Sequence, residues 1–403
     1  MDFSFTEEDE AFRTDARAWL EAHLTGDFAE ARGQGGPGSE HEGGAARRAW
    51  ERELGRGGWI GIGWGDGAYG NRSASLTQQV VWAEEYARAE APGRYGHIGE
   101  NLLAPTLLAY GSAAQKQRFL PAIARGEELW CQGYSEPGAG SDLAGVRTAA
   151  AREGDAYRIT GQKVWTSLAH EADWCFVLAR TDPDARRHQG LSFLLVPMDQ
   201  PGRIEVRPIR QLTGTSEFNE VFFDGAVARA EHRVGAEGEG WQVAMGLLGL
   251  ERGVSTLVQQ IGFAEELATV VRTAVASGAA EDPVVRDRLV RQWAELRAMR
   301  WNALRTLGSS GARDAGAPSV AKLLWGAWHR RLGELAVQVR GALATVGPSD
   351  WSAERAYELD ALQRLFLFTR ADTVYGGSDE VQRNIIAERV LGLPREPKGG
   401  VRS

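Results

Sequence analysis

The most informative polar stretch of the chain is QGYSEPGAGSD, at residues 132–142. Its glycines and Pro137 predict a tight loop with exposed backbone N–H groups, and Ser135 and Ser141 add two hydroxyl groups. Such a loop can hold the polar edge of a ring or a pyrophosphate through main-chain contacts. The alternative is an ordinary glycine-rich turn between a helix and a strand, because the pattern Gly-x-Gly is common in turns.

A second stretch, GQKVWTS at residues 161–167, offers an aromatic face beside a hydroxyl group. On a strand, Ser167 lies two residues after Trp165 and therefore points to the same side. A flat tricyclic ring could stack on the indole and form a hydrogen bond with the hydroxyl group. The alternative is a tryptophan of the protein core, which the 14 tryptophans of the chain favour on numbers alone.

An acidic residue follows an apolar stretch in GLLGLER, at residues 246–252. If a helix buries Glu251, the burial raises the pKa of its carboxyl group toward the range that suits a general base. The alternative is a solvated surface charge beside Arg252, since adjacent residues of a helix do not face each other. Periodicity does not separate these two interpretations.

A fourth stretch, TVYGGSDEVQRN at residues 373–384, contains a Gly-Gly-Ser break. Gly376 and Gly377 end one helix, and Ser378 is a candidate N-cap of the next. The start of that helix favours anionic or polar groups of a ligand. The alternative is a plain turn between two helices.

Three blocks of different periodicity must position these stretches. Residues 1–128 show helical spacing of apolar residues, interrupted by a glycine-rich loop at 33–44. Helices are expected at 73–91 and from an N-cap at Ser112 to Arg125. Residues 129–234 contain short apolar runs between turn signals, which predicts a β-barrel or sandwich. The expected strands are Trp174–Ala179, Leu191–Pro197, Ile204–Pro208 and Asn219–Phe223.

Residues 235–403 return to helical spacing. Long helices are expected at 240–276, 282–307, 318–343 and 353–373, and a last helix follows residues 376–378. Pro283 and Pro318 suit the first turn of a helix. The fold class is therefore α+β and multidomain: an N-terminal helical domain (1–128), a middle β domain (129–234) and a C-terminal four-helix bundle (235–403).

The composition limits the class of protein. The 403 residues have a formal net charge of −8, which argues against nucleic acid as a partner, because such proteins present a basic face. The chain has two cysteines, Cys131 and Cys175, and a single disulfide bond could not organise a chain of this size, so a reducing compartment is expected. The acidic start is unlike a signal peptide, and no run of 18 apolar residues occurs. The sequence predicts a cytoplasmic protein with no membrane span and no metal site.

In this order along the chain, the four stretches resemble the acyl-CoA dehydrogenase family, in its bacterial type with the catalytic glutamate on a helix of the C-terminal domain. The loop at 136–142 is the most specific match, and QRNIIA at 382–387 supports it. The segment from GEGW at 238–241 to ERG at 251–253 is similar to the family's helix that leads to one of its base positions. The resemblance extends to RVLGL at 389–393 and so covers nearly the whole chain.

The resemblance implies the family's fold, in which the β domain is a barrel, with FAD between this barrel and the helical bundle. It implies that Trp165 covers the flavin ring and that Ser167, where the family usually has Thr, bonds near N5. The other implied cofactor contacts are Gln132, Tyr134, Ser135, Gly140, Ser141, Gly377, Ser378 and Glu380. The implied substrate contacts are Ser141, Gly249 and Arg252.

The resemblance also implies the chemistry. Family members place the catalytic Glu at one of two positions, and the one directly before the Gly-Thr/Ser element is Gly376 here. The family pattern thus implies Glu251 as the base that removes the α-proton of an acyl-CoA thioester, while the β-hydride passes to FAD. The product would be trans-2-enoyl-CoA, and the electrons would leave to an electron-transfer flavoprotein.

The sequence departs from the family pattern at three places. Arg-x-x-Phe-Gly, with which one subunit of many relatives holds its neighbour's FAD pyrophosphate, is missing near 272–290, where Arg286 or Arg288 could substitute. The adenine segment reads QVRGALA at 338–344, and an extra loop, GPSDW, follows at 347–351. Some relatives with such changes work beside an unlike subunit. The resemblance therefore implies a homo-oligomer, a dimer or tetramer, or a heteromer with a related subunit.

Three other functions stay open on the same scaffold. They are a biosynthetic dehydrogenase linked to acyl-carrier protein, a non-catalytic FAD-binding subunit of a heteromeric dehydrogenase, and a flavin monooxygenase. An intact Glu251 and an intact loop at 135–142 count against the last two. The sequence does not give the acyl chain, which can be straight, branched, aromatic or steroid. Candidates for lining its pocket are Leu102, Leu103, Pro105 and Leu108.

Overall fold

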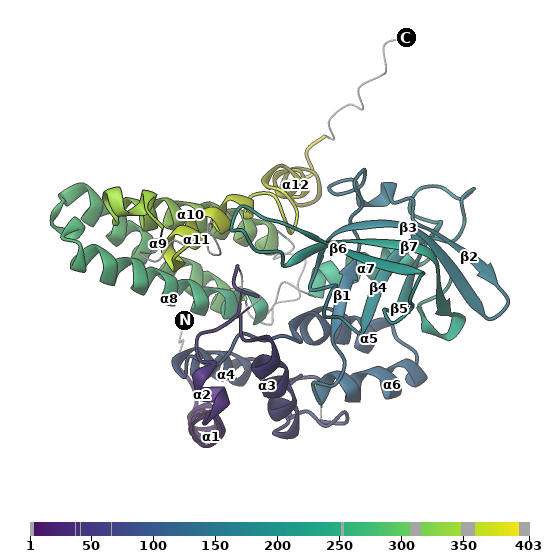
Figure 1. Cartoon of the computed structure of the whole chain (residues 1–403), viewed down its shortest axis with the longest axis horizontal. Coiled ribbons are helices and arrows are strands. Elements are labelled where there is room, and N and C mark those ends of the chain that lie inside the picture. The colour runs from purple at the N-terminus through teal and green to yellow at the C-terminus, as the bar shows by residue number, and fades with distance from the viewer. Residues whose placement is uncertain are drawn as a thin grey trace, which may run out of the picture. The chain divides into compact units, whose positions relative to one another are not determined.

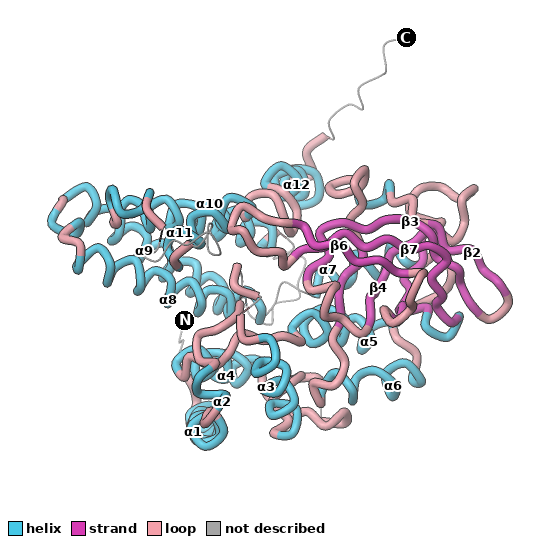
Figure 2. Tube along the Cα trace, in the orientation of Figure 1, coloured by secondary structure: helices cyan, strands magenta, loops and turns pink. Residues whose placement is uncertain are grey.

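The computed structural model describes residues 4–36, 38–40, 42–65, 67–250, 254–306, 316–347 and 359–394. The chain forms two compact units, Met1–Val258 and Gln259–Ser403, and each is described by itself. Figure 1 shows helices and a β-sheet in the first unit and helices in the second. Figure 2 shows the strands in magenta, and along the chain they come after helices α1 to α6 and before helices α7 to α12. The predicted order of helical region, β domain and helical region is therefore confirmed. The domain limits at residues 128 and 234 stay a prediction.

The N-terminal region consists of helices with well-defined starts. They are α1 (Glu7–His23), α2 (Asp27–Glu30), α3 (Gly44–Arg56), α4 (Leu76–Arg88), α5 (Ala104–Tyr110) and α6 (Ala113–Ala124). Capping boxes begin α4, with Ser75 and Gln78, and α6, with Ser112 and Gln115. The predicted N-cap at Ser112 is thus confirmed, and the helix expected at 73–91 is α4. The described residues of the predicted loop at 33–44 form turns and irregular chain up to the start of α3.

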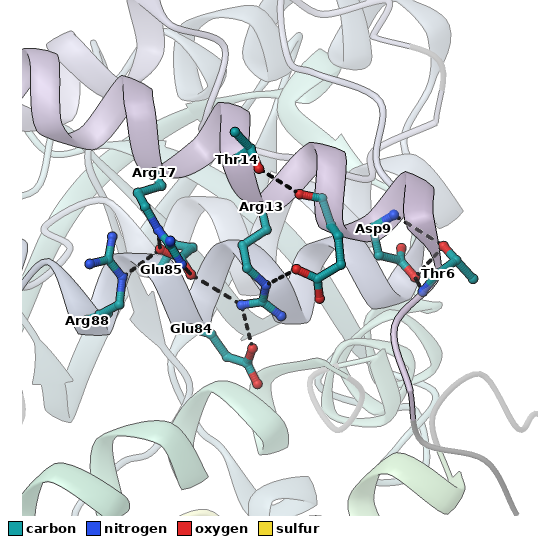
Figure 3. Close-up of polar contacts among 9 residues, drawn as sticks. Thr6, Asp9, Arg13, Thr14, Arg17, Glu84, Glu85 and Arg88 are labelled. Carbon is teal, nitrogen blue, oxygen red and sulfur yellow. Dashed lines mark hydrogen bonds and ion pairs between the residues drawn. The ribbon is translucent and has the colours of Figure 1, made fainter.

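Charged side chains join α1 to α4 (Figure 3). The Glu85 carboxylate is almost fully buried and accepts hydrogen bonds from Arg13, Arg17 and Arg88, with N···O distances of 3.2, 3.0 and 2.7 Å. Arg13 also donates to Glu84 at 2.9 Å. Burial alone would raise the pKa of Glu85, but the three arginines outweigh it and lower the pKa to about 2. This carboxylate is therefore ionised at neutral pH and ties the two helices together.

The strands of the middle region form one sheet within the described residues. They are β1 (Trp130–Gly133), β2 (Ala149–Glu153), β3 (Ala156–Ser167), β4 (Trp174–Arg180), β5 (Leu191–Pro197), β6 (Ile204–Ile209), β7 (Phe218–Arg229) and β8 (Arg233–Val234). The order is β6-β7-β3-β2-β4-β5-β8, and β1 pairs with β4 off this path. Both β1 and β2 run parallel to β4, at its beginning and its end, while β5 occupies the other edge. The loop from β1 to β2, residues 134–148, therefore leaves and rejoins the same edge of β4.

Strands β4 and β5 are buried on both faces. On one face, Phe176 and Phe193 belong to a core with residues of α5, α6 and α7 (Gly240–Leu250). On the other face, Val177 and Leu194 belong to a core with residues of β3 and β7. A strand covered on both faces needs apolar residues at consecutive positions, which explains its continuous apolar run. The four predicted strands are confirmed as β4, β5, β6 and β7.

The two cysteines of the chain lie opposite each other in the sheet. Cys131 on β1 and Cys175 on β4 are register partners, and both are free and fully buried. Burial and the neighbouring thiol raise the pKa of Cys131 well above its usual range. Both side chains lie in the core with residues of β3 and β7, so both thiols are shielded from solvent.

The second unit is a group of packed helices. They are α8 (Val254–Ala276), which begins at the end of the first unit, α9 (Pro283–Thr306), α10 (Ala317–Gln338), α11 (Ala361–Phe368) and α12 (Asp379–Ile385). A common core, which includes Phe263, Leu296 and Trp328, joins α8, α9 and α10. Pro283 begins α9 and Pro318 lies in the first turn of α10, as predicted. In the described part of the chain, no helix combines the length and the apolar character that a bilayer span needs.

Three expected helices differ from the structure. The helix expected at 240–276 is described as α7 and α8, and residues 251–253 between them lie outside the described residues. The helix expected at 318–343 ends at Gln338, because Gly341 takes a left-handed φ of +54° and only a 3-10 turn follows. Of the helix expected at 353–373, α11 begins at Ala361, and residues 348–358 lie outside the described residues.

Candidate active site

A buried lysine fixes the start of the loop between β1 and β2. Lys163, on β3, is fully buried, and its ammonium group donates to the carbonyl oxygens of Tyr134 and Leu178 at 3.0 and 2.7 Å. It also donates to the Glu136 carboxylate at 2.9 Å. Burial lowers the pKa of Lys163, and the attraction of Glu136 opposes this shift. Because each of its three N–H groups has an acceptor, the charge is tolerated inside the protein.

The same glutamate holds the end of the loop. The Glu136 carboxylate accepts from the backbone N–H groups of Arg147 and Thr148 at 2.7 and 2.9 Å. Burial raises the pKa of Glu136, but Lys163 and the hydrogen bonds from these two residues outweigh it, and the pKa is lowered. One ionised carboxylate thus binds both ends of the loop. Sequence reasoning missed this ion pair, although Lys163 is one of four lysines in the chain and lies in a stretch of interest.

The tip of the loop is open. A Cβ at Gly138 or Gly140 would meet nothing within 4 Å, and Ser141 is exposed. Nearer the base of the loop, the carbonyl oxygen of Ser135 accepts from the backbone N–H of Val164 at 2.9 Å. The structure therefore brings the glycine-rich stretch and the tryptophan stretch side by side.

Two residues expected to contact the cofactor, at the start of the loop, have side chains that are less exposed to solvent than the tip. The ring of Tyr134 is buried, with its centroid 5.9 Å from that of Phe176 and 6.2 Å from that of Phe193. Gln132 lies on β1 and is half-buried. The Tyr134 ring meets these two stacked rings edge-on and belongs to the same core, and its cofactor contact stays a prediction.

Trp165 lies at a β-bulge with its indole exposed. The register between β3 and β7 shifts between Lys163 and Thr166, and Trp165 has a left-handed φ of +61°. A bulge of this kind changes the direction of a side chain. Trp165 is 57% exposed, so it is not a tryptophan of the core. Thr166 is fully buried and Ser167 half-buried, which leaves Trp165 and Ser167 on the outer side of the strand.

These residues fit a flavin. The exposed indole of Trp165 offers a flat face, and the hydroxyl group of Ser167 has no hydrogen-bond partner within the described ranges. The open backbone of Gly140 and the hydroxyl group of Ser135 lie on the adjoining loop. A flat ring with polar edges needs such a combination of a stacking face with a few hydrogen-bonding groups.

Helix α7 leads directly to Glu251. A Cβ at Gly240 would collide with the backbone of Ser192 on β5, and one at Gly246 would collide with Tyr110 on α5, so glycine allows α7 to pack closely on both. Gly249, an expected substrate contact, has open space at its Cβ position. Glu251 and Arg252 lie outside the described residues, and their roles stay predictions.

In the second unit, the Gly-Gly-Ser stretch forms a turn that requires glycine. Gly376 and Gly377 have left-handed φ angles of +65° and +86°. The buried side chain of Gln382 donates to both of their carbonyl oxygens at 3.3 Å. Ser378 is the N-cap of α12, as predicted, and Glu380 is exposed on the first turn. The turn is thus well defined, and its cofactor contacts stay predictions.

The two arginines expected near the pyrophosphate lie on α9. Arg288 donates to the side-chain oxygen of Gln338 at 2.6 Å, and Gln338 begins the segment expected to hold adenine. Arg286 is exposed and bonds the carbonyl oxygen of Ala280 at 3.5 Å. The structure therefore brings Arg288, and not Arg286, to the adenine segment.

Known proteins match along the whole chain. Models of the acyl-CoA dehydrogenase N-terminal, middle and C-terminal domains match residues 6–127, 131–226 and 238–391. The acyl-CoA dehydrogenase IpdE1 of Mycobacterium tuberculosis is 56% identical over 390 residues, which cover 97% of this chain and 99% of that protein. The IpdE1 of Mycolicibacterium smegmatis is 54% identical over 398 residues, with 96% and 98% covered.

Solved structures match as well. The Tcur3481-Tcur3483 steroid ACAD superimposes with a TM-score of 0.81 at 31% identity, covering 98% of this chain and 100% of that one. The ChsE4-ChsE5 complex from Mycobacterium tuberculosis gives a TM-score of 0.78 at 30% identity, with 98% and 100% covered. With an open stacking face, a fixed glycine-rich loop and relatives of more than half identity over nearly its full length, this chain belongs to the acyl-CoA dehydrogenase family and is an FAD-dependent oxidoreductase.

Proposed function

We propose that the chain converts an acyl-CoA thioester to trans-2-enoyl-CoA, with Glu251 as the base that removes the α-proton. The observation that carries this proposal is the backbone at Gly376. This residue occupies one of the family's two base positions, and its left-handed φ of +65° disfavours any residue but glycine. Position 376 offers no carboxylate, and the other base position is Glu251, directly after α7.

The reaction removes a proton and a hydride from neighbouring carbons. Bound FAD would supply the acceptor for the hydride of the β-carbon. The Glu251 carboxylate takes the α-proton, and the electron pair of the broken C–H bond forms the new double bond. The loop between β1 and β2 is held by Glu136 and Lys163 before any ligand arrives, so its N–H groups need little reorganisation during the reaction. An electron-transfer flavoprotein is the proposed final acceptor of the electrons.

The proposed contacts divide between cofactor and substrate. For FAD they are the indole of Trp165, the hydroxyl groups of Ser135 and Ser167, the backbone of Gln132, Tyr134 and Gly140, Ser141, and in the second unit Gly377, Ser378 and Glu380. For the thioester they are Ser141, Gly249 and Arg252. Each follows from the match of this sequence to the family pattern.

We further propose a steroid-derived acyl-CoA as the substrate and a related, unlike subunit as the partner. The support is that one similar structure is named a steroid ACAD and another is a complex of ChsE4 with ChsE5. Light scattering of the purified chain tests the partner. A homodimer or homotetramer with full FAD content and full activity would make the unlike subunit unnecessary.

Anaerobic bleaching of the bound flavin tests the base and the substrate together. Glu251→Gln keeps the shape of the side chain but removes the base, so bleaching should slow about 10²- to 10⁴-fold while FAD stays bound. Glu265→Gln, at an exposed position on α8, is the matched control and should bleach at the wild-type rate. In a panel of straight, branched, aromatic and steroid acyl-CoAs, the steroid thioester should react fastest. Near wild-type bleaching by Glu251→Gln would overturn the assignment.

Gly376→Glu in the Glu251→Gln background tests whether both base positions face one α-carbon. A Cβ at position 376 would make only ordinary contacts, the nearest at 3.7 Å to Cε of Lys322. The left-handed φ costs a non-glycine residue on the order of 1–3 kcal/mol, so rescue of bleaching should be partial. A folded, FAD-bound double variant with no rescue at all would show that position 376 does not reach the substrate.

Three outcomes would point to the alternative functions. Reaction with an acyl-carrier-protein thioester and not with acyl-CoA would indicate a carrier-linked enzyme. Stoichiometric FAD that no thioester bleaches would indicate a non-catalytic subunit. Oxygen-dependent hydroxylation of the product would indicate a monooxygenase.

A further inference from the structure

A buried histidine in the second unit is held between two carboxylates. His329, on α10, is 3% exposed. Its Nδ1 lies 2.7 Å from Asp372 Oδ2, and its Nε2 lies 2.7 Å from Glu266 Oε2. Glu266 is on α8 and Asp372 follows α11, so these residues join three segments of the unit. The ring of Phe263, on α8, packs on the imidazole with a centroid distance of 4.3 Å.

Asp372 connects this histidine to the Gly-Gly-Ser turn. Asp372 is fully buried, and its second oxygen accepts from the hydroxyl group of Tyr375 at 2.7 Å. Its carbonyl oxygen accepts from the buried ammonium group of Lys322. Gly376 follows Tyr375 directly in the chain, so a displacement of Asp372 reaches the turn through Tyr375. We call Glu266, His329, Asp372 and Tyr375 the His329 cluster.

Only a protonated imidazole satisfies the His329 cluster. A neutral imidazole has one N–H group, so it donates to one carboxylate and turns a lone pair toward the other. An imidazolium donates to both. Burial lowers the pKa of His329, but Glu266 and Asp372 outweigh the burial and raise the pKa to about 9. The ring is therefore charged at neutral pH.

We propose that His329 is a positioning residue for the cofactor: by donating to both Glu266 and Asp372, it fixes the turn at Gly376–Ser378. The proposal rests on the proposed contacts of Gly377 and Ser378 with FAD. His329 itself bonds the carboxylates and not the turn, so it acts through Asp372 and Tyr375. The loss of its charge leaves the buried Asp372 and the partly exposed Glu266 facing one N–H group, so Asp372, to which Tyr375 is bonded, is no longer held in place.

The charge of His329 gives the proposal a pH signature. The other titratable groups around it are Glu266 from α8, Asp372 and Tyr375 beyond α11, and Lys322 from its own helix. Burial and the charge of Asp372 raise the pKa of Tyr375, so this hydroxyl group keeps its proton over the same range.

The sign follows from the direction of the shift. A histidine whose folded pKa lies above its ordinary value of 6.5 contributes its full stabilisation below pH 6.5 and loses it as the pH rises through about 9. FAD retention by the wild type is therefore expected to fall between about pH 8 and pH 10.

The test uses the full-length, FAD-loaded protein and measures the FAD dissociation constant against pH. His329→Gln can donate to one carboxylate only, so the dissociation constant at pH 7 should rise about 5- to 150-fold, the usual range for coupling between sites. In His329→Gln/Glu266→Gln, the amide at 329 donates to Asp372 and accepts from the amide at 266. Affinity should recover in this double variant, and its fall above pH 8 should disappear. His23→Gln is the matched control, because His23 bonds Glu53 at 2.7 Å at a half-exposed site of the first unit.

A second measurement follows the protonation of His329 in the protein without FAD. NMR titration of labelled histidines should show His329 changing charge near pH 9, and a value below 7 would overturn the proposal. If His329→Gln does not fold, Glu266→Gln alone should lower the pH at which FAD is lost, and an unchanged midpoint would overturn the proposal equally. Equal FAD affinity in a folded His329→Gln and the wild type would do so as well.

Ser378→Asp separates this proposal from the cofactor contact on which it rests. Aspartate keeps the N-cap of α12 but adds a negative charge that repels the phosphates of FAD. Wild-type FAD affinity in Ser378→Asp would show that the turn does not hold the cofactor phosphates, which removes the basis of both proposals. Weakened binding in Ser378→Asp but not in His329→Gln would leave the contact standing and overturn only the role of His329.

Discussion

Lys163→Met removes the ammonium group that anchors the loop between β1 and β2, while keeping most of the volume of a fully buried side chain. In the variant, the carbonyl oxygens of Tyr134 and Leu178 lose this donor, and Glu136 keeps only its two main-chain hydrogen bonds. Glu136 still bonds the start of the loop to its end, but the loop is no longer bonded to Lys163 of β3. We expect a loss of stability together with a loss of FAD affinity.

The magnitude follows from the burial of the pair. Breaking one side of a buried ion pair typically costs about 3–5 kcal/mol, because the remaining charge has no partner. Glu136 retains two N–H donors, so the lower end of that range applies, about 3 kcal/mol of unfolding free energy. At about 2–4 °C per kcal/mol, the Tm of the first unit should fall by about 6–12 °C.

Calorimetry of the flavin-free protein and FAD titration measure the two effects. Lys163→Met/Glu136→Gln should recover part of the Tm, because no unpaired charge remains, although one amide oxygen must then serve two N–H groups. Lys116→Met, at a half-buried lysine of α6, is the matched control and should melt as the wild type does. A Tm of Lys163→Met within about 2 °C of the wild type, with unchanged FAD affinity, would refute the anchoring role.

Two further predictions concern Trp165 and Glu85. Trp165→Ala should weaken FAD binding but leave the flavin-free fold within about 0.5 kcal/mol of the wild type, because the residue is 57% exposed; a large drop of Tm without FAD would contradict this. Glu85→Gln should lower the unfolding free energy at pH 7 by about 1–3 kcal/mol. This range follows from the fall of the Glu85 pKa from 4.5 to about 2, and it is reduced because the partners Arg17 and Arg88 are half-exposed to solvent. A carboxyl group whose pKa is lowered on folding stabilises the folded protein when the pH is above its unfolded pKa. This stabilisation is lost as the pH falls through the folded pKa of about 2, so the denaturation curves of variant and wild type should converge between pH 4.5 and pH 2. Curves that stay apart at pH 2 would contradict the role of Glu85.

Elements whose limits depend on nearby residues were predictable from the sequence. The strand Leu191–Pro197 has its expected bounds, because a strand covered on both faces shows as one apolar run. The N-cap at Ser112 needs only a serine and a glutamine three residues later. By contrast, β1 (Trp130–Gly133) has four residues and pairs in parallel with a strand far along the chain, so no local alternation marks it.

The side-chain contacts of the candidate site were harder to predict than the four stretches of sequence that form it. The ion pair of Lys163 with Glu136 and the two carboxylates on His329 join residues that are distant in sequence, and single residue types carry no signal of such pairing. The exposure of Trp165 depends on a bulge that shifts the register against β7. The ring of Tyr134 belongs to the core and meets Phe176 and Phe193 edge-on, which the residues of the short strand before it do not reveal.

Cys131 and Cys175 are free thiols that lie side by side on β1 and β4, so thiol labelling measures local opening around these strands. A reagent reaches the buried thiols only when the core that they share with β3 and β7 opens, and β1 carries the loop at 134–148. When closing is faster than labelling, the alkylation rate reports the population of the open form, and when labelling is faster, it reports the opening rate itself. Since the chain has no other cysteine, both labels report on the opening of the same core. A ligand that rests on this loop would therefore slow alkylation without touching either sulfur atom.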